Sequence, residues 1–126
     1  MAIRILIVDD HPFVRRALKS AIAEHADWSL TAEAADGIEA VDKVEELRPD
    51  IVMLDLSMPN MGGLEACRQI RKVAPDTEVL IVTQHDSRQM MEEAQAAGAR
   101  GYVVKAKLAR DLESAVAAVS QHRPFP

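Results

Sequence analysis

Side chains that stack on bases or sugars are scarce in this sequence. Only four of its 126 residues are aromatic, namely Phe13, Trp28, Tyr102 and Phe125, so it offers no stacking platform for single-stranded nucleic acid. Positive charge is also in deficit, because the formal net charge is −5. Proteins bind phosphate backbones through basic surfaces, so we do not expect this chain to bind nucleic acid directly.

Cysteine and long apolar runs are lacking as well. Cys67 stands alone, which excludes an intrachain disulfide and a multi-cysteine zinc site and favours a reducing compartment. No stretch approaches the length of a membrane span. The apolar run at residues 5–8 is too short for a signal peptide and ends at Asp9 and Asp10. We therefore expect a cytoplasmic protein with no membrane partner.

Five short apolar runs are present, and they alternate with segments of helical period. Four of the runs are dense in Ile, Leu and Val, which is typical of strands buried on both faces of a parallel sheet. The second run is mixed with polar residues, as expected nearer a sheet edge. The runs occupy residues 3–8, 30–35, 51–54, 79–82 and 102–104.

Helix boundaries can be predicted between these runs. Asp36 followed by Glu39 resembles a capping box, and Pro49 marks the end of that helix. Asp86 is the expected N-cap of the fourth helix, which stops at Gly98.

This alternation predicts an α/β fold with a doubly wound, five-stranded parallel sheet. The expected arrangement is flavodoxin-like (β/α)5 with strand order 2-1-3-4-5. Residues 3–120 should form this domain. Residues 121–126 contain two prolines and are expected to begin a linker to an effector domain outside this chain.

Chemically useful side chains stand where the predicted strands end. Asp9 and Asp10 follow the first strand, Asp55 follows the third, Thr83 ends the fourth and Lys105 follows the fifth. In a doubly wound sheet the carboxyl ends of the strands carry the working site, so these residues should meet at one edge. Each has an ordinary explanation alone, since Asp9 could cap the following helix, but the ordered set favours a common site.

Three carboxylates at one edge repel each other, and a hard cation with oxygen ligands relieves that repulsion. Mg²⁺ suits a few carboxylates together with water and phosphate oxygens. Lys105 adds a compact positive charge and Thr83 a hydroxyl donor. Asp55 is the best candidate nucleophile, because a carboxylate can attack phosphorus and form an acyl phosphate.

Segments that contain these residues resemble the receiver (phosphoacceptor) domain of two-component response regulators. The resemblance extends from about Ile3 to Val119 and is greatest to the NarL/FixJ-like subgroup. It is carried by Ile5-Leu6-Ile7-Val8-Asp9-Asp10-His11-Pro12, Asp50-Ile51-Val52-Met53-Leu54-Asp55-Leu56-Ser57-Met58-Pro59, Ile81-Val82-Thr83 and Gly98-Ala99-Arg100-Gly101-Tyr102-Val103-Val104-Lys105.

The resemblance implies a role for each residue of the metal site. Asp55 would be the phosphoacceptor. Asp10 would be the main side-chain ligand of Mg²⁺, supported by Asp9, and Asp55 and the backbone carbonyl of Ser57 would complete the protein ligands.

The resemblance also implies a switch. Lys105 would contact the phosphoryl group and Thr83 would move toward it, while the ring of Tyr102 would turn inward. The phosphodonor would be a sensor histidine kinase or a phosphotransfer protein. Relatives often dimerise through the last two helices, where Arg110 and Asp111 lie, and often control transcription through a C-terminal helix-turn-helix domain.

Two departures from the family pattern affect the site. Ala106 replaces the proline that many receivers have after the lysine, and Gln84 and His85 follow Thr83 where many have a small residue. The four histidines, His11, His25, His85 and His122, show no ligand spacing and are not predicted to bind metal.

Other functions are less well supported. A haloacid-dehalogenase-like phosphatase would need a second aspartate where Ser57 stands, and the chain is not expected to be a turnover enzyme. A flavin module would need Gly, Ser and Thr donors after the first strand, where Asp-Asp-His-Pro stands. A degenerate receiver that acts only as an interaction surface stays open.

Overall fold

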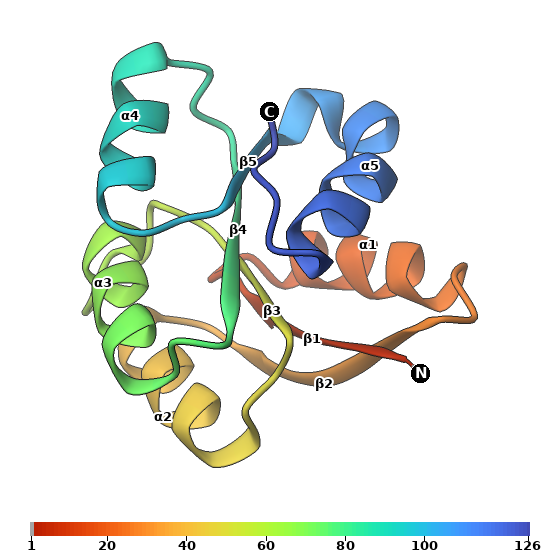
Figure 1. Cartoon of the computed structure of the whole chain (residues 1–126), viewed down its shortest axis with the longest axis horizontal. Helices are drawn as coiled ribbons and strands as arrows, with labels where there is room; N and C mark the ends of the chain where they lie inside the picture. Colours follow the sequence, from red (N-terminus) through yellow and green to blue (C-terminus); the bar gives the residue numbers. More distant parts are fainter. Residues whose placement is uncertain (1) are drawn as a thin grey trace.

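Five parallel strands form the centre of the molecule in the computed structural model, which describes residues 2–126 (Figure 1). Their order is β2-β1-β3-β4-β5, and every neighbouring pair is parallel. The predicted fold and strand order are therefore confirmed. The strands are β1 (Ile3–Val8), β2 (Trp28–Ala34), β3 (Ile51–Leu54), β4 (Glu78–Thr83) and β5 (Gly101–Val104).

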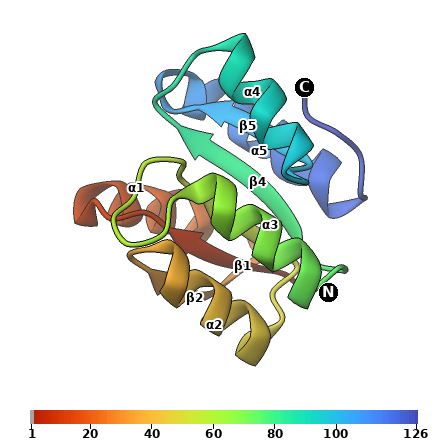
Figure 2. The same ribbon diagram turned by 90° about the vertical axis from the view of Figure 1, so that its left-hand side faces the viewer.

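Helices cover both faces of this sheet, as Figures 1 and 2 show. Helices α1 and α5 pack on one face through a cluster that includes Leu18, Ile22 and Val116. The other three pack on the opposite face. The helices are α1 (Pro12–Ala23), α2 (Gly37–Leu47), α3 (Gly63–Val73), α4 (Arg88–Ala96) and α5 (Leu108–Ser120), with a short 3-10 turn, η1 (Lys105–Lys107), before α5.

Strand β4 begins one residue earlier than the apolar run predicts, at Glu78. This glutamate is only 2% exposed. Its carboxylate lies 2.8 Å from Nη1 of Arg71 and 3.0 Å from Nε of Arg100, and its Oε2 lies 2.7 Å from Nδ1 of His122. These partners allow a charged residue to enter the strand, since a buried charge is tolerated only when it is paired.

The helix caps agree with prediction at one site and differ at another. Asp36 caps α2 as expected, because its side chain accepts a 2.9 Å hydrogen bond from the amide of Glu39. This bond is the main reason why the pKa of Asp36 is lowered. The prediction for α4 was wrong. Its N-cap is Ser87, whose hydroxyl accepts a hydrogen bond from the amide of Met90, and Asp86 lies one residue outside the cap.

The loop between β3 and α3 is tied to the start of α2. Nδ2 of Asn60 donates a 2.7 Å hydrogen bond to Oδ2 of Asp36, and the amide of Gly37 donates to the carbonyl of Met61 at 3.1 Å. Asn60 has φ 66°, a left-handed conformation that asparagine tolerates better than most residues. This loop is therefore held from a neighbouring element.

Helix α4 is anchored less firmly than α3. Of the nine residues of α4 as described, Ala94 alone is buried, whereas α3 buries Gly63, Ala66, Cys67 and Ile70. Cys67 lies in the core as predicted, and burial raises the pKa of its thiol to about 12.

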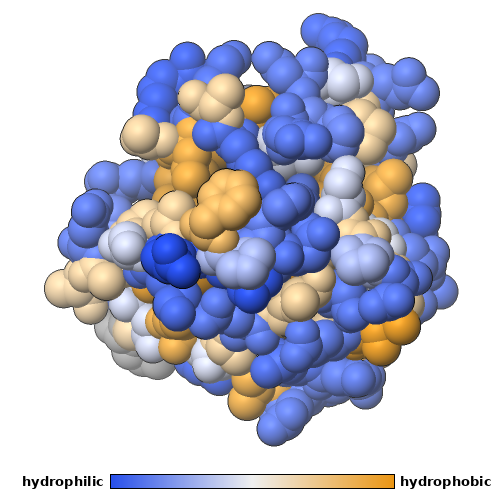
Figure 3. Space-filling view, turned by 180° about the vertical axis from the view of Figure 1, so that it is seen from behind, coloured by the Kyte–Doolittle hydropathy of each residue, from blue (hydrophilic) through white to orange (hydrophobic). Residues whose placement is uncertain are grey.

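The surface in Figure 3 carries apolar patches separated by hydrophilic side chains. The large exposed apolar residues are Phe13, Leu30 and Ile38, and Phe13 is the most exposed at 67%. Within residues 2–126, none of the helices has both the length and the apolar composition that a membrane span requires.

Candidate functional site

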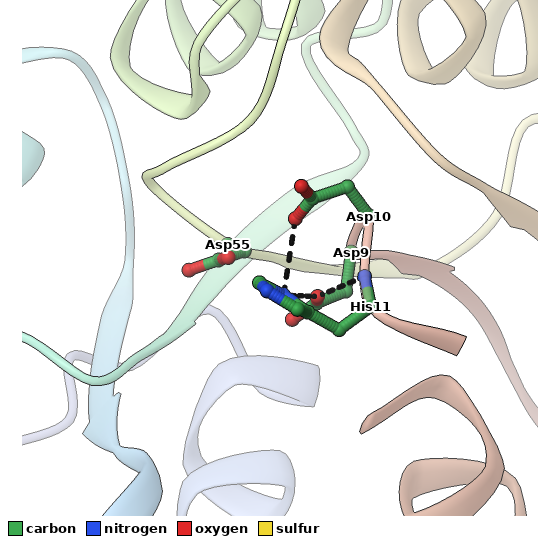
Figure 4. A group of neighbouring side chains, drawn as sticks. All are labelled: Asp9, Asp10, His11 and Asp55. Atoms are coloured by element: carbon green, nitrogen blue, oxygen red, sulfur yellow. Dashed lines mark hydrogen bonds and ion pairs between the residues drawn. The ribbon is translucent and has the colours of Figure 1, made fainter. Parts of the chain in front are cut away.

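Four of the five side chains predicted to meet at the carboxyl ends of the strands lie together there, namely those of Asp9, Asp10, Asp55 and Lys105. Asp9 and Asp10 follow β1 directly, Asp55 follows β3, and Lys105 follows β5. Figure 4 shows the three carboxylates converging from the ends of β1 and β3. Asp9 and Asp55 are nearly buried, with exposed fractions of 1% and 3%.

Lys105 connects two of these carboxylates. Its Nζ donates a 2.8 Å hydrogen bond to Oδ2 of Asp9 and lies 3.6 Å from Oδ2 of Asp55. Asp9 also accepts a 2.9 Å hydrogen bond from the amide of His11. The charge of Asp9 is therefore offset by Lys105. Asp9 is not the N-cap of α1, because that position is occupied by His11.

One carboxylate oxygen of Asp10 accepts no hydrogen bond from the residues that the structure describes. Within residues 2–126, its buried Oδ1 has no hydrogen-bond partner, although it lies 3.2 Å from Nδ1 of His11. One ligand atom from each of Asp9, Asp10, His11 and Asp55 lies within 4.8 Å of the others. An unpaired buried carboxylate oxygen among other carboxylates suits a hard divalent cation, because such ions prefer oxygen ligands. This acidic cluster can therefore hold a metal ion.

The environment of Asp55 opposes its negative charge. Burial raises the pKa of Asp55 above its ordinary value, and the charge of Asp9 adds to this effect, whereas Lys105 opposes it. The amide of Leu56 donates a 2.8 Å hydrogen bond to Oδ1 of Asp55 and stabilises the carboxylate. A cation bound beside Asp55 would favour the ionised form, which is the nucleophilic one.

A second group of polar contacts lies next to this cluster. The hydroxyl of Ser57 lies 2.9 Å from Nε2 of His85, and the amide of His85 donates to Oγ1 of Thr83 at 3.4 Å. The hydroxyl of Tyr102 donates a 2.8 Å hydrogen bond to the carbonyl of His85. The loop after β4 is thus joined both to the loop after β3 and to β5.

The ring of Tyr102 points inward. Tyr102 is 6% exposed and belongs to the core on the α3 and α4 side of the sheet. Burial raises the pKa of its hydroxyl, and the charge of Asp86 contributes. The bond to His85 gives this buried hydroxyl its partner, as such groups require.

Two histidines near the site were not expected from the sequence. His11 lies among the aspartates and His85 contacts Ser57, whereas all four histidines had been set aside for lack of ligand spacing. The two rings come from the loops after β1 and β4, so their spacing along the sequence does not reveal that they lie near the site. That no histidine binds metal stays a prediction. The only available signal was position, since each follows a strand-end site residue within two positions.

The pair suggested for dimer contacts is engaged within the chain. Nε of Arg110 donates a 2.8 Å hydrogen bond to Oδ1 of Asp111, its neighbour on α5. Arg110 is exposed, whereas Asp111 is half-buried. Their role in dimerisation stays a prediction.

Comparison with known proteins agrees with this geometry. The family model described as the response regulator receiver domain matches residues 5–117. The chain is 41% identical over 105 residues to the chemotaxis protein CheY of Thermotoga maritima, covering 83% of this chain and 87% of that protein. It is 37% identical over 121 residues to the response regulator protein VraR of Staphylococcus aureus, covering 96% of this chain and 58% of VraR.

A solved structure with the same fold supports the assignment. A LuxR-family two-component response regulator from Aurantimonas sp. SI85-9A1 superposes with a TM-score of 0.95 at 38% identity. The alignment covers 100% of this chain and 90% of that one. The fold, the family match and the relatives agree, and the chain belongs to the response regulator receiver domain family of two-component systems.

Proposed function

We propose that Asp55 accepts a phosphoryl group and that this modification shifts the domain between two conformations that control an output. The observation that carries the proposal is the position of Lys105, whose ammonium group lies 2.8 Å from Asp9 and 3.6 Å from Asp55. Such a charge is suited to an anion that arrives beside a carboxylate nucleophile.

Mg²⁺ is the cofactor that the ligand set fits best. Asp10 and Asp55 would bind it with the backbone carbonyl of Ser57, and Asp9 would support them. The unpartnered Oδ1 of Asp10 supports this assignment. When bound, the ion supplies positive charge that offsets the negative charge of the phosphoryl oxygens.

The residues of the chain have distinct tasks in the transfer. An oxygen of Asp55 forms a bond to phosphorus, while the bond between phosphorus and the donor's imidazole nitrogen breaks and its electron pair stays on nitrogen. Lys105 holds the transferred group by its charge. Thr83 offers a hydroxyl donor at the end of β4, where its side chain is fully buried.

The conformational response would start at Thr83 and involve Tyr102. In the population-shift description, the phosphoryl group favours the arrangement in which Thr83 approaches it and the β4–α4 loop moves. The weak anchoring of α4, which buries only Ala94 among its described residues, is consistent with an element that moves.

The wider assignment follows the family. The phosphodonor would be a sensor histidine kinase or phosphotransfer protein, and the domain would not turn over a separate substrate. Transcriptional output through a helix-turn-helix domain that would follow residues 121–126 is consistent with the similarity to a solved DNA-binding response regulator of the LuxR family from Staphylococcus aureus. A homodimer through the last two helices and a cytoplasmic location stay predictions.

The proposal is tested by phosphorylation in vitro. Acetyl phosphate with Mg²⁺ is expected to add one phosphoryl group, measured by intact mass, and removal of Mg²⁺ with a chelator should prevent this. Asp55→Ala should abolish the modification. Retained modification in this variant would contradict the assignment of Asp55.

Asp42→Asn provides a matched control. Asp42 is an exposed aspartate within α2 that does not belong to the acidic cluster, so the change removes a carboxylate without touching the site. This variant should be phosphorylated like the parent. If the parent chain reacted with neither acetyl phosphate nor beryllofluoride, the domain would instead be a degenerate receiver.

A further inference from the structure

The outer edge of β5 is covered by the C-terminal segment of the chain. β5 is the last strand of the sheet, so it would otherwise expose unpaired backbone groups. The carbonyl of Phe125 accepts a 2.8 Å hydrogen bond from the amide of Tyr102, and the amide of Phe125 donates to the carbonyl of Arg100 at 3.1 Å. Figure 1 shows this segment running back alongside β5. We call residues 121–126 the C-terminal strap.

Two side chains hold the C-terminal strap in place. Phe125 packs against the core on the α1 and α5 side of the sheet. His122 places Nδ1 2.7 Å from Oε2 of the buried Glu78, at the start of β4. Gly101 permits the close approach of α5 and the strap, since a Cβ there would lie 2.9 Å from Cγ2 of Val119 and 3.4 Å from the carbonyl oxygen of Phe125.

Tyr102 contacts the C-terminal strap and the β4–α4 loop at the same time. Its amide donates to Phe125, and its hydroxyl donates a 2.8 Å hydrogen bond to the carbonyl of His85. His85 in turn contacts both Thr83 and Ser57. A single residue of β5 thus joins the C-terminal strap to the loop beside the acidic cluster.

We propose that docking of the C-terminal strap and the inward contact of Tyr102 with His85 stabilise each other. Pairing with Phe125 restricts the backbone of Tyr102, which lowers the entropy that is lost when its hydroxyl is held against the loop. Release of the strap removes this restriction and loosens residues 83–87. Displacement of the C-terminal strap therefore reaches the site through Tyr102.

The coupling must act equally in both directions, because linked equilibria are reciprocal. Weakening the strap should loosen the β4–α4 loop, and removing the hydroxyl of Tyr102 should loosen the strap by a similar factor. If the strap merely covered the edge of the sheet, weakening it would affect only the amide of Tyr102, which is bonded to it. The β4–α4 loop would not change.

The test is amide hydrogen exchange by NMR in the full chain without metal or phosphodonor. Phe125→Ala is expected to speed exchange at the amide of Tyr102 and across residues 83–87 by about 5-fold or more, the lower range of typical couplings. Tyr102→Phe keeps the ring and removes the hydroxyl, and it should speed exchange at the amide of Phe125 by a similar factor. The double variant should show no further effect of Phe125→Ala on residues 83–87.

Arg123→Ala is the matched control within the strap, because Arg123 is exposed and contributes a backbone hydrogen bond to Ala118. It should leave exchange at both places unchanged. If Phe125→Ala sped exchange at Tyr102 alone, or if Tyr102→Phe left Phe125 unchanged, the proposed coupling would be wrong. The inference deepens the proposed role of Tyr102, but its test needs no phosphorylation, so failure of the Asp55 assignment would leave these exchange results unaffected.

Discussion

Nζ of Lys105 lies closer to Oδ2 of Asp9, at 2.8 Å, than to Oδ2 of Asp55, at 3.6 Å. The positive charge is therefore placed on the carboxylates that are the proposed metal ligands. A cation bound at the cluster must share these carboxylates with the ammonium group and be repelled by it. Lys105 should favour the phosphoryl group while disfavouring the metal.

Lys105→Ala is accordingly expected to tighten Mg²⁺ binding by about tenfold, equivalent to ~1.4 kcal/mol of relieved repulsion. The same variant should be phosphorylated more slowly, because it lacks the charge that holds the transferred group. Calorimetric titration with Mg²⁺ measures the first effect. Lys107→Ala, on the exposed side of η1, is the control that should change neither quantity. Weaker Mg²⁺ binding in Lys105→Ala would show that this lysine organises the metal ligands instead of competing for them.

Asp55 should reduce the stability of the metal-free fold at neutral pH. Burial raises its pKa in the folded state above that in the unfolded chain, so ionisation disfavours folding. Stability from the neutral form is present below the unfolded pKa and is lost as the pH rises through the folded pKa.

Asp55→Asn removes this ionisation and should raise the midpoint of urea unfolding at pH 7. The gain should shrink as the pH falls through the raised folded pKa of Asp55, and it should be absent below the unfolded pKa of about 3.9. Mg²⁺ should stabilise the parent more than the variant, because a ligand that binds only the folded state adds more stability the more tightly it binds. An equal gain at pH 7 and below the unfolded pKa would indicate that the charge of Asp55 is not the cause.

Gly63 is the position at which α3 touches the site. A Cβ there would lie 2.2 Å from the carbonyl oxygen of Asp55 and 2.6 Å from Cα of Leu56, which are backbone atoms with little freedom to move. Gly63→Ala should cost about 2 kcal/mol of stability through overpacking and displace Asp55. It should therefore also slow phosphorylation.

Gly62→Ala is the matched control, because it makes the same substitution at the neighbouring position. A Cβ at Gly62 would lie 3.6 Å from its nearest neighbour, the carbonyl oxygen of Leu56, which is an ordinary contact. The change should cost less than about 1 kcal/mol, mostly from the poorer N-cap. Urea unfolding of the two variants measures the difference. Equal losses would mean that α3 can shift to make room.

Glu78 should be a major stabilising residue far from the site. Glu78→Gln removes the charge that faces Arg71 and Arg100, leaving two partly exposed guanidinium groups beside a neutral buried amide. We expect a loss of about 2 kcal/mol, below the range for fully buried pairs because water screens both arginines. Glu65→Gln breaks an exposed pair with Arg68 on α3 and should have little effect. If Glu78→Gln left the free energy of unfolding unchanged, the ion pairs of Glu78 would contribute no more than the cost of removing its charge from water.

The strand ends could be predicted because they follow from short-range pattern and simple topology. Buried parallel strands produce dense apolar runs, and the direction of the chain then places Asp9, Asp10, Asp55 and Lys105 at one edge. The sequence did not predict Glu78 as part of β4. Its partners come from α3, the segment before β5 and the C-terminal strap, so no pattern near Glu78 in the sequence indicates them.

Other features depend on details that a sequence does not encode locally. Asp86 and Ser87 are both good N-caps, and the choice of Ser87 depends on how the loop leaves β4. Phe125 covers β5 through backbone groups that every residue possesses, so the sequence of residues 121–126 does not indicate this pairing. The contact between Ser57 and His85 joins two loops and needs the assembled sheet.

The hydrogen bonds from Asn60 to Asp36 and from Gly37 to Met61 fix one of the two loops beside the site more firmly than the other. The loop that carries the carbonyl of Ser57 is braced against α2, whereas the loop that carries His85 leads into the lightly buried α4. If a group binds between them, we expect the braced loop to move less than the loop that carries His85. The displacement should then be directed toward α4 and Tyr102, so the resting fold would set the direction of the response.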